Sequence, residues 1–558
     1  MAEGESRPAG PPQDGEGTTG SGQQQRSEAT RREFLRLVGG ALGGVALGMY
    51  GGGGAYGQGG GNGLPNGYVF YRVFTLGGAA NPFPFAPLTD LIPGVMLTEQ
   101  DQILFHGANS TGLRGVYALN MSYGLSSGST PQVLGGNKLV QVGDVLPDGR
   151  PVRNIAPGDT NALGSYATVI GTGNPNTEFD PTNSGLITPN PGLPAAFGGT
   201  DDWTPQSQAP ASSAPPITAS GVYIQKDPGS GLQPLVNLSS PTPPLDQKGT
   251  QGQFGAIHGD IALQDDDSIL LSAFYSLYNT DLGPNGTPIG PQAQQGLFNL
   301  VGGTASDQGT LVQTTGDVLP LSGTLLTGFG LVDVSPDGYY VAQAYAAHRG
   351  RGGGWGRGVQ RGPGGPHPSV LLNGHVARRG STRLLAASRE LVPPRSNVAV
   401  GETILGPRVG RRNWIGHVVH TTESHHQVVL HRNGASTRAH QTGTRLLGDY
   451  ATVTTSPVVV APTGLFYFTT IDAGGYTHLW VSTGQPNDPT ATTKLLLSSQ
   501  DTTVNGGGMV TEMWFGYHTA QADSAGRIIF TAEFLSDPNA DPTNPANITT
   551  SIVVGIPV

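Results

Sequence analysis

Three short patterns recur in a fixed order along the chain, and this order constrains the fold more than any other feature of the sequence. The first pattern is a short apolar stretch, as in Gly115-Val116-Tyr117. The second is Gly-Asp-Val-Leu, as at 143–146. The third is a turn followed by alternating apolar residues, as in Asp101–Phe105. Self-similarity of this kind predicts one structural unit that is repeated many times.

The copies are spread over most of the chain. The first pattern occurs at 115–117, 221–224 and 296–300, with looser copies at 369–372, 427–430, 478–481 and 551–554. The second occurs at 143–146, 316–319, 401–404 and 443–446. The third occurs at 101–105, 267–271, 337–341, 463–468 and 525–530.

The physical meaning of the third pattern is a tight hairpin. Asp-Gly or Thr-Gly supplies a residue in the left-handed region, and the alternation that follows sends every second side chain to one face of a sheet. A unit of about 50 to 75 residues then holds roughly four strands, which need neighbouring units to bury both faces. Closing such units into a ring gives an all-β fold, a β-propeller.

The number of copies predicts seven four-stranded blades in residues 69–558, closed by the C-terminal strand. Six copies of the first pattern are followed by the rest of a unit, and the seventh, near Ile552, is not. Residues 88–107 resemble the end of a unit without its beginning, so we expect the C-terminal strand to complete that sheet. The unit at 369–422 departs from the pattern because its second half is short, so the sequence does not decide whether it forms the fourth blade. A generic β protein with ordinary turns is the alternative.

Composition agrees with a protein made of short strands and many turns. The 558 residues include 88 Gly and 45 Pro, and only 12% are charged. The sequence has no cysteine, which excludes disulfides, thiolate metal sites and thiol nucleophiles.

The N-terminus carries the features of an export signal. Residues 1–30 contain almost no apolar side chain and are predicted to be disordered. Arg31, Arg32, Phe34 and Leu35 match the twin-arginine signal, and a glycine-rich apolar stretch follows. Residues 31–57 are therefore predicted to be a signal peptide that engages the twin-arginine translocase, with cleavage after Gly57. An uncleaved signal that serves as an anchor is the alternative.

With its repeats and its signal, the chain resembles exported bacterial β-propeller-like repeat proteins of uncharacterised function, whose units read GLF…GDxL…DGxIxF. The resemblance covers roughly residues 69–558. Its motifs are structural, so it implies a propeller fold and export to the periplasm, cell surface or medium, and it assigns no catalytic residue.

Two segments interrupt the repeats, and the charge is unevenly distributed. Residues 172–220 are predicted to be a surface insertion, and 346–367 a disordered Gly/Arg tract. Residues 346–445 hold fifteen Arg and three Glu, a net charge of +12. This basic segment predicts an anionic cell-envelope partner, although the sequence contains no specific nucleic-acid motif. A wrong reading frame within 346–440 is the alternative explanation.

Candidate metal sites are weak. His417, His420, His425 and His426 are close in sequence, but strand geometry would send His417 and His420 to opposite faces. Two runs place oxygen ligands at alternate positions, so calcium is the one candidate cofactor. The first run consists of Asn174, Asn176, Glu178 and Asp180, and the second of Asp537, Asn539 and Asp541.

Other polar and aromatic clusters favour structural roles. Asp265, Asp266 and Asp267 lie at a hairpin turn and are expected to be solvated. The aromatic residues that could line a sugar-binding surface are expected in the core, and they are Trp480, Trp514, Tyr517 and His518.

Two functions from different classes are consistent with these sequence features. The first, which we favour, is an exported binding or structural propeller. The second is an exported hydrolase or lyase with a carboxylate or calcium site at the propeller axis. The positions of Asp144, Asp317 and Glu402 discriminate between them, because convergence at the axis would indicate a site and a peripheral ring would indicate turns.

Overall fold

The structure is a computed structural model, and Leu64–Val558 form one compact unit in it. It describes residues 63–558 except for 79–81, 84–86, 111, 124–129, 157, 173–219, 228, 239, 279–292, 303–307, 320–324, 348–368, 379, 388–399, 422–425, 433–434, 442–452, 455–457, 473–474, 486–491, 517–520, 538 and 542–543.

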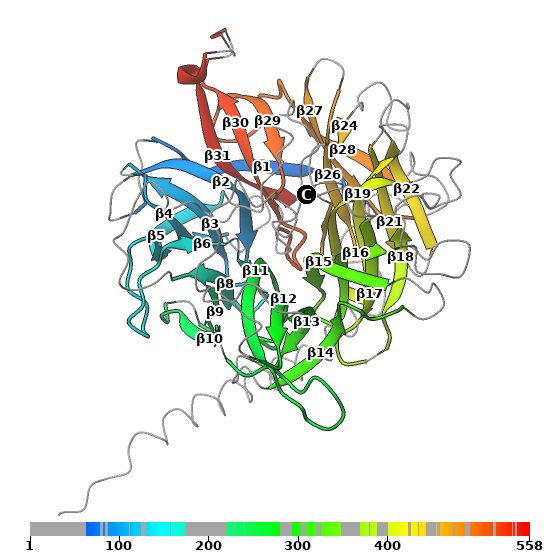
Figure 1. The fold of residues 1–558 in the computed structure, drawn as a ribbon. Coiled ribbons are helices and arrows are strands. Elements are labelled where there is room, and N and C mark those ends of the chain that lie inside the picture. Colours follow the sequence, from blue (N-terminus) through cyan, green and yellow to red (C-terminus); the bar gives the residue numbers. More distant parts are fainter. Residues whose placement is uncertain are drawn as a thin grey trace, which may run out of the picture. The chain divides into compact units, whose positions relative to one another are not determined.

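Seven antiparallel sheets form a ring in this unit, and we number them as blades 1 to 7 (Figure 1). Blade 1 contains β2 (Leu88–Leu97), β3 (Gln102–Asn109), β4 (Arg114–Ser122) and β5 (Gln132–Gln141). Blade 2 contains β6 (Asn154–Ile155), β7 (Asp159–Thr160), β8 (Tyr166–Gly171), β9 (Ser220–Gln225) and β10 (Gln233–Asn237). Blade 3 contains β11 (Gln253–Leu263), β12 (Ile269–Ser276), β13 (Gln294–Leu300) and β14 (Gly309–Thr314).

The remaining four blades follow in chain order, except that the last one also takes the first strand. Blade 4 contains β15 (Leu325–Val334), β16 (Tyr339–Ala347), β17 (Ser369–His375) and β18 (Arg383–Ala387). Blade 5 contains β19 (Val400–Gly410), β20 (Trp414–Thr421), β21 (His426–Arg432) and β22 (Ala435–Gln441). Blade 6 contains β24 (Val453–Thr454), β25 (Val459–Val460), β26 (Phe466–Ile471), β27 (Thr477–Ser482) and β28 (Thr493–Ser498). Blade 7 contains β29 (Met509–Trp514), β30 (Ile528–Leu535), β31 (Ile548–Pro557) and β1 (Tyr68–Thr75).

The predicted all-β propeller with seven four-stranded blades is confirmed, and both ends of the described chain take part in closing the ring. The C-terminal strand β31 pairs with β30 on one side and with β1 on the other. The expectation that residues 88–107 form its N-terminal partner is wrong, because β2 and β3 belong to a complete sheet of their own. The fourth strand of blade 7 therefore comes from β1.

All seven copies of the first pattern are the third strands of their blades, from β4 to β31. The third pattern is the turn into the second strand, and the left-handed residues predicted for the Asp-Gly and Thr-Gly turns are confirmed, since Gly338 has φ 80° and Gly464 has φ 86°. Asp101 and Asp267 are also left-handed, with φ 59° and 64°, although no glycine follows them. The repeat read from the sequence is therefore correct but out of phase with the blades, since it starts at a third strand.

The unit with the short second half forms complete sheets. β17 and β18 finish blade 4, and β19 begins blade 5, which has its full set of four strands. Gly401 and Glu402 lie in the innermost strand β19 and not in a turn after an outer strand, so the fit of 401–404 to the second pattern is wrong. Blade 5 has a buried apolar face that packs on blade 4 through Ile415, Val419 and Val429.

Every innermost strand is interrupted near its middle. In β2 the register shifts between Ile92 and Met96, and in β11 between Ile257 and Ile261. β15 and β19 shift in the same way, and the innermost strands of blades 2, 6 and 7 are split. The strands nearest the axis therefore hold irregular backbone where a regular ladder would continue.

The predicted export signal lies outside the described residues, and so do residues 1–30. Most of the insertion at 172–220 and of the tract at 346–367 is also outside, although Ala346 and Ala347 end β16. Among the residues that the structure describes, no helix is long and apolar enough to cross a membrane.

Candidate functional site

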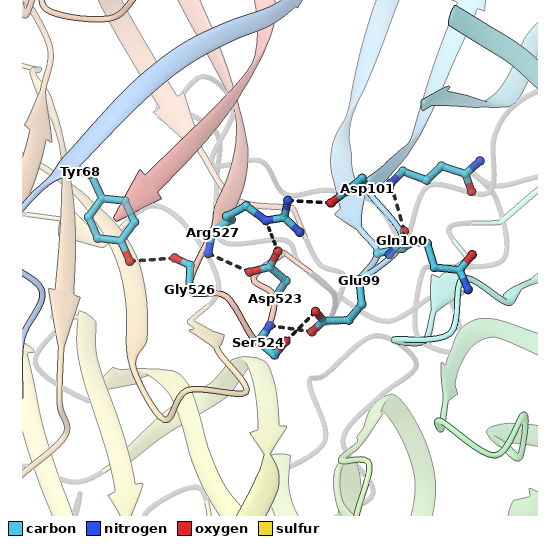
Figure 2. Close-up of polar contacts among 10 residues, drawn as sticks. Tyr68, Glu99, Gln100, Asp101, Asp523, Ser524, Gly526 and Arg527 are labelled. Atoms are coloured by element: carbon cyan, nitrogen blue, oxygen red, sulfur yellow. Dashed lines mark hydrogen bonds and ion pairs between the residues drawn. The ribbon is translucent and has the colours of Figure 1, made fainter. Parts of the chain in front are cut away.

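The connections between first and second strands, and between third and fourth strands, lie at the same end of every blade because the strands are antiparallel. We call this side of the ring the turn face. Carboxylates on its turns bind the neighbouring blade. The contact between blades 7 and 1, which we call the seam, shows this most fully (Figure 2).

At the seam, two turns exchange charged hydrogen bonds. Glu99 accepts from the backbone N–H and the hydroxyl of Ser524, each at 2.6 Å. The Arg527 guanidinium donates to Asp101 at 2.7 Å and to Asp523. Burial raises the pKa of Asp523 to about 6, although the Arg527 guanidinium opposes this shift. The seam is therefore held by a buried ion pair whose acid has a raised pKa.

The aspartates at 265–267 tie blade 3 to blade 2, so the expectation that they are solvated is wrong for two of them. Asp267 is buried and accepts from Ser165 Oγ at 2.6 Å and from Asn161 at 3.0 Å. Asp265 accepts from the N–H of Ala162 at 3.2 Å. Burial raises the pKa of Asp265, and the nearby carboxylates add to this effect.

Two carboxylates on innermost strands make matching contacts to the next blade. Asp159 accepts from the N–H of Leu263 at 2.8 Å, and Asp333 accepts from the N–H of Val409 at 2.6 Å. Burial raises the pKa of Asp333 to about 7, although Arg408 opposes this. These buried groups bind backbone amides, which indicates a structural role near the axis rather than an open carboxylate site.

The aspartates of the second pattern form turns at the outer edge of their blades. Asp144 Oδ2 accepts from the N–H of Gln141 at 2.8 Å, and Asp317 Oδ2 from that of Thr314 at 3.1 Å. Each follows the outermost strand of its blade, β5 or β14. Glu402 lies on the innermost strand β19. The three residues do not converge, and the two aspartates have the role expected of turns.

Arginines gather on the turn face of blades 4 and 5. Arg378, Arg411 and Arg412 are exposed, and Arg432 is half-buried. Trp414 packs near two guanidinium groups, with Arg432 at 4.4 Å and Arg412 at 5.8 Å from its ring. We call these four arginines with Trp414 the basic patch. The sequence indicated its charge within 346–445 but neither its position on the fold nor the role of Trp414.

Local backbone geometry fixes the patch. Arg412 and Asn413 have φ 60° and 58°, so the turn between β19 and β20 is left-handed at two successive residues. The N–H of Arg412 donates to Asp337 of blade 4 at 2.8 Å. Arg432 donates to the carbonyl oxygens of Thr483 at 2.5 Å and Gly464 at 3.4 Å in blade 6. The patch therefore joins three blades.

The four predicted histidines do not form one cluster. His417 is buried and stacks on His431, with ring centroids 5.1 Å apart. His420 pairs in register with His426 at the other end of the hairpin, and His425 lies outside the described residues. Burial lowers the pKa of His417 well below its usual value. Three or more His, Cys, Asp or Glu residues that could hold a metal do not come together in the part of the chain that the structure describes.

One of the two calcium candidates can be located. Asp537 Oδ1 accepts from the N–H and the side chain of Asn539, at 2.9 and 3.3 Å, and both residues are exposed. This is a local turn that caps itself. Asn174, Asn176, Glu178 and Asp180 lie outside the described residues.

The two tryptophans among the aromatic candidates are in the core, as expected. Trp480 and Trp514 are buried, and Trp480 Nε1 donates to Thr470 at 2.8 Å. Tyr517 and His518 lie outside the described residues.

No protein-family model matches the chain, and no curated protein matches its sequence. Similar solved structures include an oligogalacturonate lyase in complex with manganese, with 12% identity and a TM-score of 0.34 over 89% of this chain and 97% of that chain. The β-propeller domain of the Trilobed protease from Pyrococcus furiosus has 7% identity and a TM-score of 0.34 over 80% of this chain and 90% of that chain. Likeness at this level carries no functional information.

Proposed function

We propose that the chain is an exported, extracytoplasmic binding propeller, and that its basic patch holds an anionic polymer of the cell envelope. The observation that carries this proposal is the polarised turn face. Carboxylates tie the turns of blade 7 to those of blade 1, and the turns of blade 3 to those of blade 2. Exposed arginines occupy the turns of blades 4 and 5, where the carboxylate of Asp337 binds the backbone of Arg412. Arg411 lies where these two regions of the turn face meet, with its Nη2 3.5 Å from Oδ2 of Asp265 in blade 3.

The chemistry of the patch suits phosphate or carboxylate groups spaced along a polymer. Guanidinium groups bind such anions in a planar, two-pronged manner that lysine does not reproduce. Packing against the Trp414 ring and fixed turns limits the motion of Arg412 and Arg432, so less conformational entropy is lost on binding. Attraction between several arginines and a polyanion falls steeply with ionic strength.

The alternative of an exported hydrolase or lyase has less support. The buried axial carboxylates Asp159 and Asp333 already accept backbone N–H groups, and the aspartates of the second pattern form turns. A binding or structural role is consistent with carboxylates that hold blades together.

Inorganic polyphosphate is a suitable probe for the test, with binding measured by calorimetry between 50 and 300 mM salt. In the variant Arg378→Asn/Arg412→Asn, asparagine is chosen because it tolerates the positive φ at residue 412. We expect its affinity at low salt to fall at least about tenfold, since each lost arginine removes one phosphate contact. Lys226→Asn/Lys248→Asn removes the same charge from exposed sites in blade 2 and in the segment that follows it, and should bind like the original protein.

Deletion of 350–365, which leaves the strands β16 and β17 intact, is the second control. If the patch and not the tract binds the polymer, the deletion leaves both the affinity and the melting temperature unchanged. Equal losses in the arginine and lysine variants, or no binding by the original protein at 50 mM salt, would contradict the proposal.

A further inference from the structure

Two glutamates of blade 7 lie directly opposite each other on neighbouring strands. Glu512 of β29 and Glu533 of β30 are partners in register. Ile529 packs into the core between blades 7 and 1, and Glu533 lies four residues later on the same regular strand. Because alternate side chains of a strand share a face, Glu533 and its partner Glu512 point toward blade 1. We call these two residues the glutamate pair.

The glutamate pair has no cationic partner among the described residues. Neither residue forms an ion pair there, and Glu533 is the only charged group that shifts the pKa of Glu512. Burial raises the pKa of Glu533, and burial together with Glu533 raises the pKa of Glu512 to about 7. Like charges directly opposite on a sheet destabilise it, so the free pair is costly above neutral pH.

Next to the glutamate pair, on the same face of blade 7, lie two buried polar atoms without hydrogen-bond partners among the described residues. Trp514 and Thr531 form the next cross-strand pair, two residues along from Glu512 and Glu533. Thr531 is 1% exposed and Trp514 is 7% exposed. Thr531 Oγ1 and Trp514 Nε1 have no hydrogen-bond partner among the described residues. Buried polar atoms are nearly always satisfied, so these two indicate a missing ligand.

We propose that Glu512, Glu533 and Thr531 bind a hard divalent cation, with Ca²⁺ the best match. Two carboxylates and a hydroxyl supply only oxygen ligands, which Ca²⁺ prefers. The half-exposed glutamates leave room for water molecules to complete the coordination, and Trp514 Nε1 can donate to one of them. The cation would remove the repulsion within the pair and join the two inner strands of blade 7.

This site differs from both calcium candidates of the sequence and from the basic patch, so it is independent of the proposed function. Mg²⁺ fits less well, because it demands near-ideal octahedral geometry and loses its water reluctantly. Zinc, copper and nickel favour nitrogen or sulfur ligands, and the four polar side chains offer no such acceptor.

Calorimetric titration of the full chain with CaCl₂ at pH 8 tests the proposal. We expect one site with a dissociation constant of about 0.1–1 mM, as in extracellular calcium modules. Glu533→Gln and Glu512→Gln should each weaken binding at least about tenfold, and Thr531→Val by a smaller factor. The matched control Asp537→Asn removes a carboxylate whose partners lie in its own turn, and should bind Ca²⁺ unchanged.

The double variant Glu512→Gln/Glu533→Gln separates loss of calcium binding from loss of folding, because it removes the repulsion between the two carboxylates and should fold. In that variant, added Ca²⁺ should no longer raise the melting temperature, while the original protein gains about 2 °C at 10 mM. At pH 5.5 the pair holds a proton and binding should weaken. Calcium binding that persists in the double variant, or its absence from the original protein at pH 8, would overturn the site.

Discussion

Arg527 is the residue on which the seam depends most. Its guanidinium contacts Asp523 and Asp101, and it lies 4.0 Å from the centre of the Tyr123 ring. Asp523 is 2% exposed, so its charge depends on Arg527 for compensation. We expect Arg527→Leu to lower the free energy of unfolding at pH 7.5 by about 3–5 kcal/mol, because it leaves a buried carboxylate unpaired.

The pH dependence of this variant gives the control. Without Arg527 the pKa of Asp523 rises further above that of the unfolded chain, so the folded variant holds a proton that the unfolded chain releases. Stability relative to the original protein should then return as the pH falls from 7.5 to 5. Urea unfolding of the variant and the original protein at pH 7.5 and at pH 5 measures this difference in stability. Arg527→Leu/Asp523→Asn should recover most of the loss, and a deficit that is equal at the two pH values would argue against the charge explanation.

At the residue scale, the sequence predicts structure well where the chemistry is local. The left-handed positions at Gly338 and Gly464 follow from their Asp-Gly and Thr-Gly turns, and they are confirmed. The partnership of Arg527 with Asp101 spans 426 positions and has no local signal. For the same reason, the sequence did not show that Asp267 binds Ser165 of the previous blade. Contacts between blades require the ring to be known first.

At the scale of elements, β31 has the position on which closure depends. It lies between β1 and β30, and Ile552, Val553 and Val554 are fully buried. Deleting 548–558 should therefore separate β1 from blade 7 and expose the edge of β30, with loss of soluble protein. Deleting 64–76 removes only the outermost strand, and should leave a soluble protein that melts several degrees lower.

Thermal melts and the soluble fraction of both truncated chains measure the difference. If the chain without 548–558 melts like the full-length protein, closure by β31 is refuted. If both truncations behave alike, the inner and outer positions in blade 7 do not differ as the topology implies.

The sequence predicts the number of blades correctly, but it places the start of each repeat at a third strand rather than at the innermost strand of a blade. Seven apolar stretches give seven third strands, because every third strand is buried and therefore reads as a short apolar run. The innermost strands were the least visible, since each is interrupted and many contain Gly or Pro there, as in Pro93-Gly94 and Gly406-Pro407. These residues weaken the alternating pattern by which a strand is recognised. The repeated interruption is itself a signal that the sequence contained.

For the whole molecule, the topology separates two faces. The turn face holds short connections that bind blade to blade. Between residues 63 and 558, the segments of more than ten residues outside the described chain all join second strands to third strands, or one blade to the next, and the strand ends that they join lie on the opposite face. These segments are 173–219, 279–292, 348–368, 388–399 and 442–452. The longest connections thus lie opposite the turn face, which displays the basic patch.

Closure of the ring by two strands that are far apart in the sequence bears on how the protein would be exported. β1 can pair with β31 only when β31 has been made, so the ring cannot close while the residues before β31 are being synthesised. The absence of cysteine means that folding needs no oxidising compartment. A protein of this kind suits the twin-arginine route, which carries folded proteins.

We therefore expect Arg31→Lys/Arg32→Lys to keep the protein in the cytoplasm, as measured by fractionation of expressing cells, and to leave its melting temperature unchanged. Arg36→Lys, outside the pair, is the matched control and should be exported normally. Equal extracytoplasmic amounts of the double variant and the original protein would show that Arg31 and Arg32 are not an export signal.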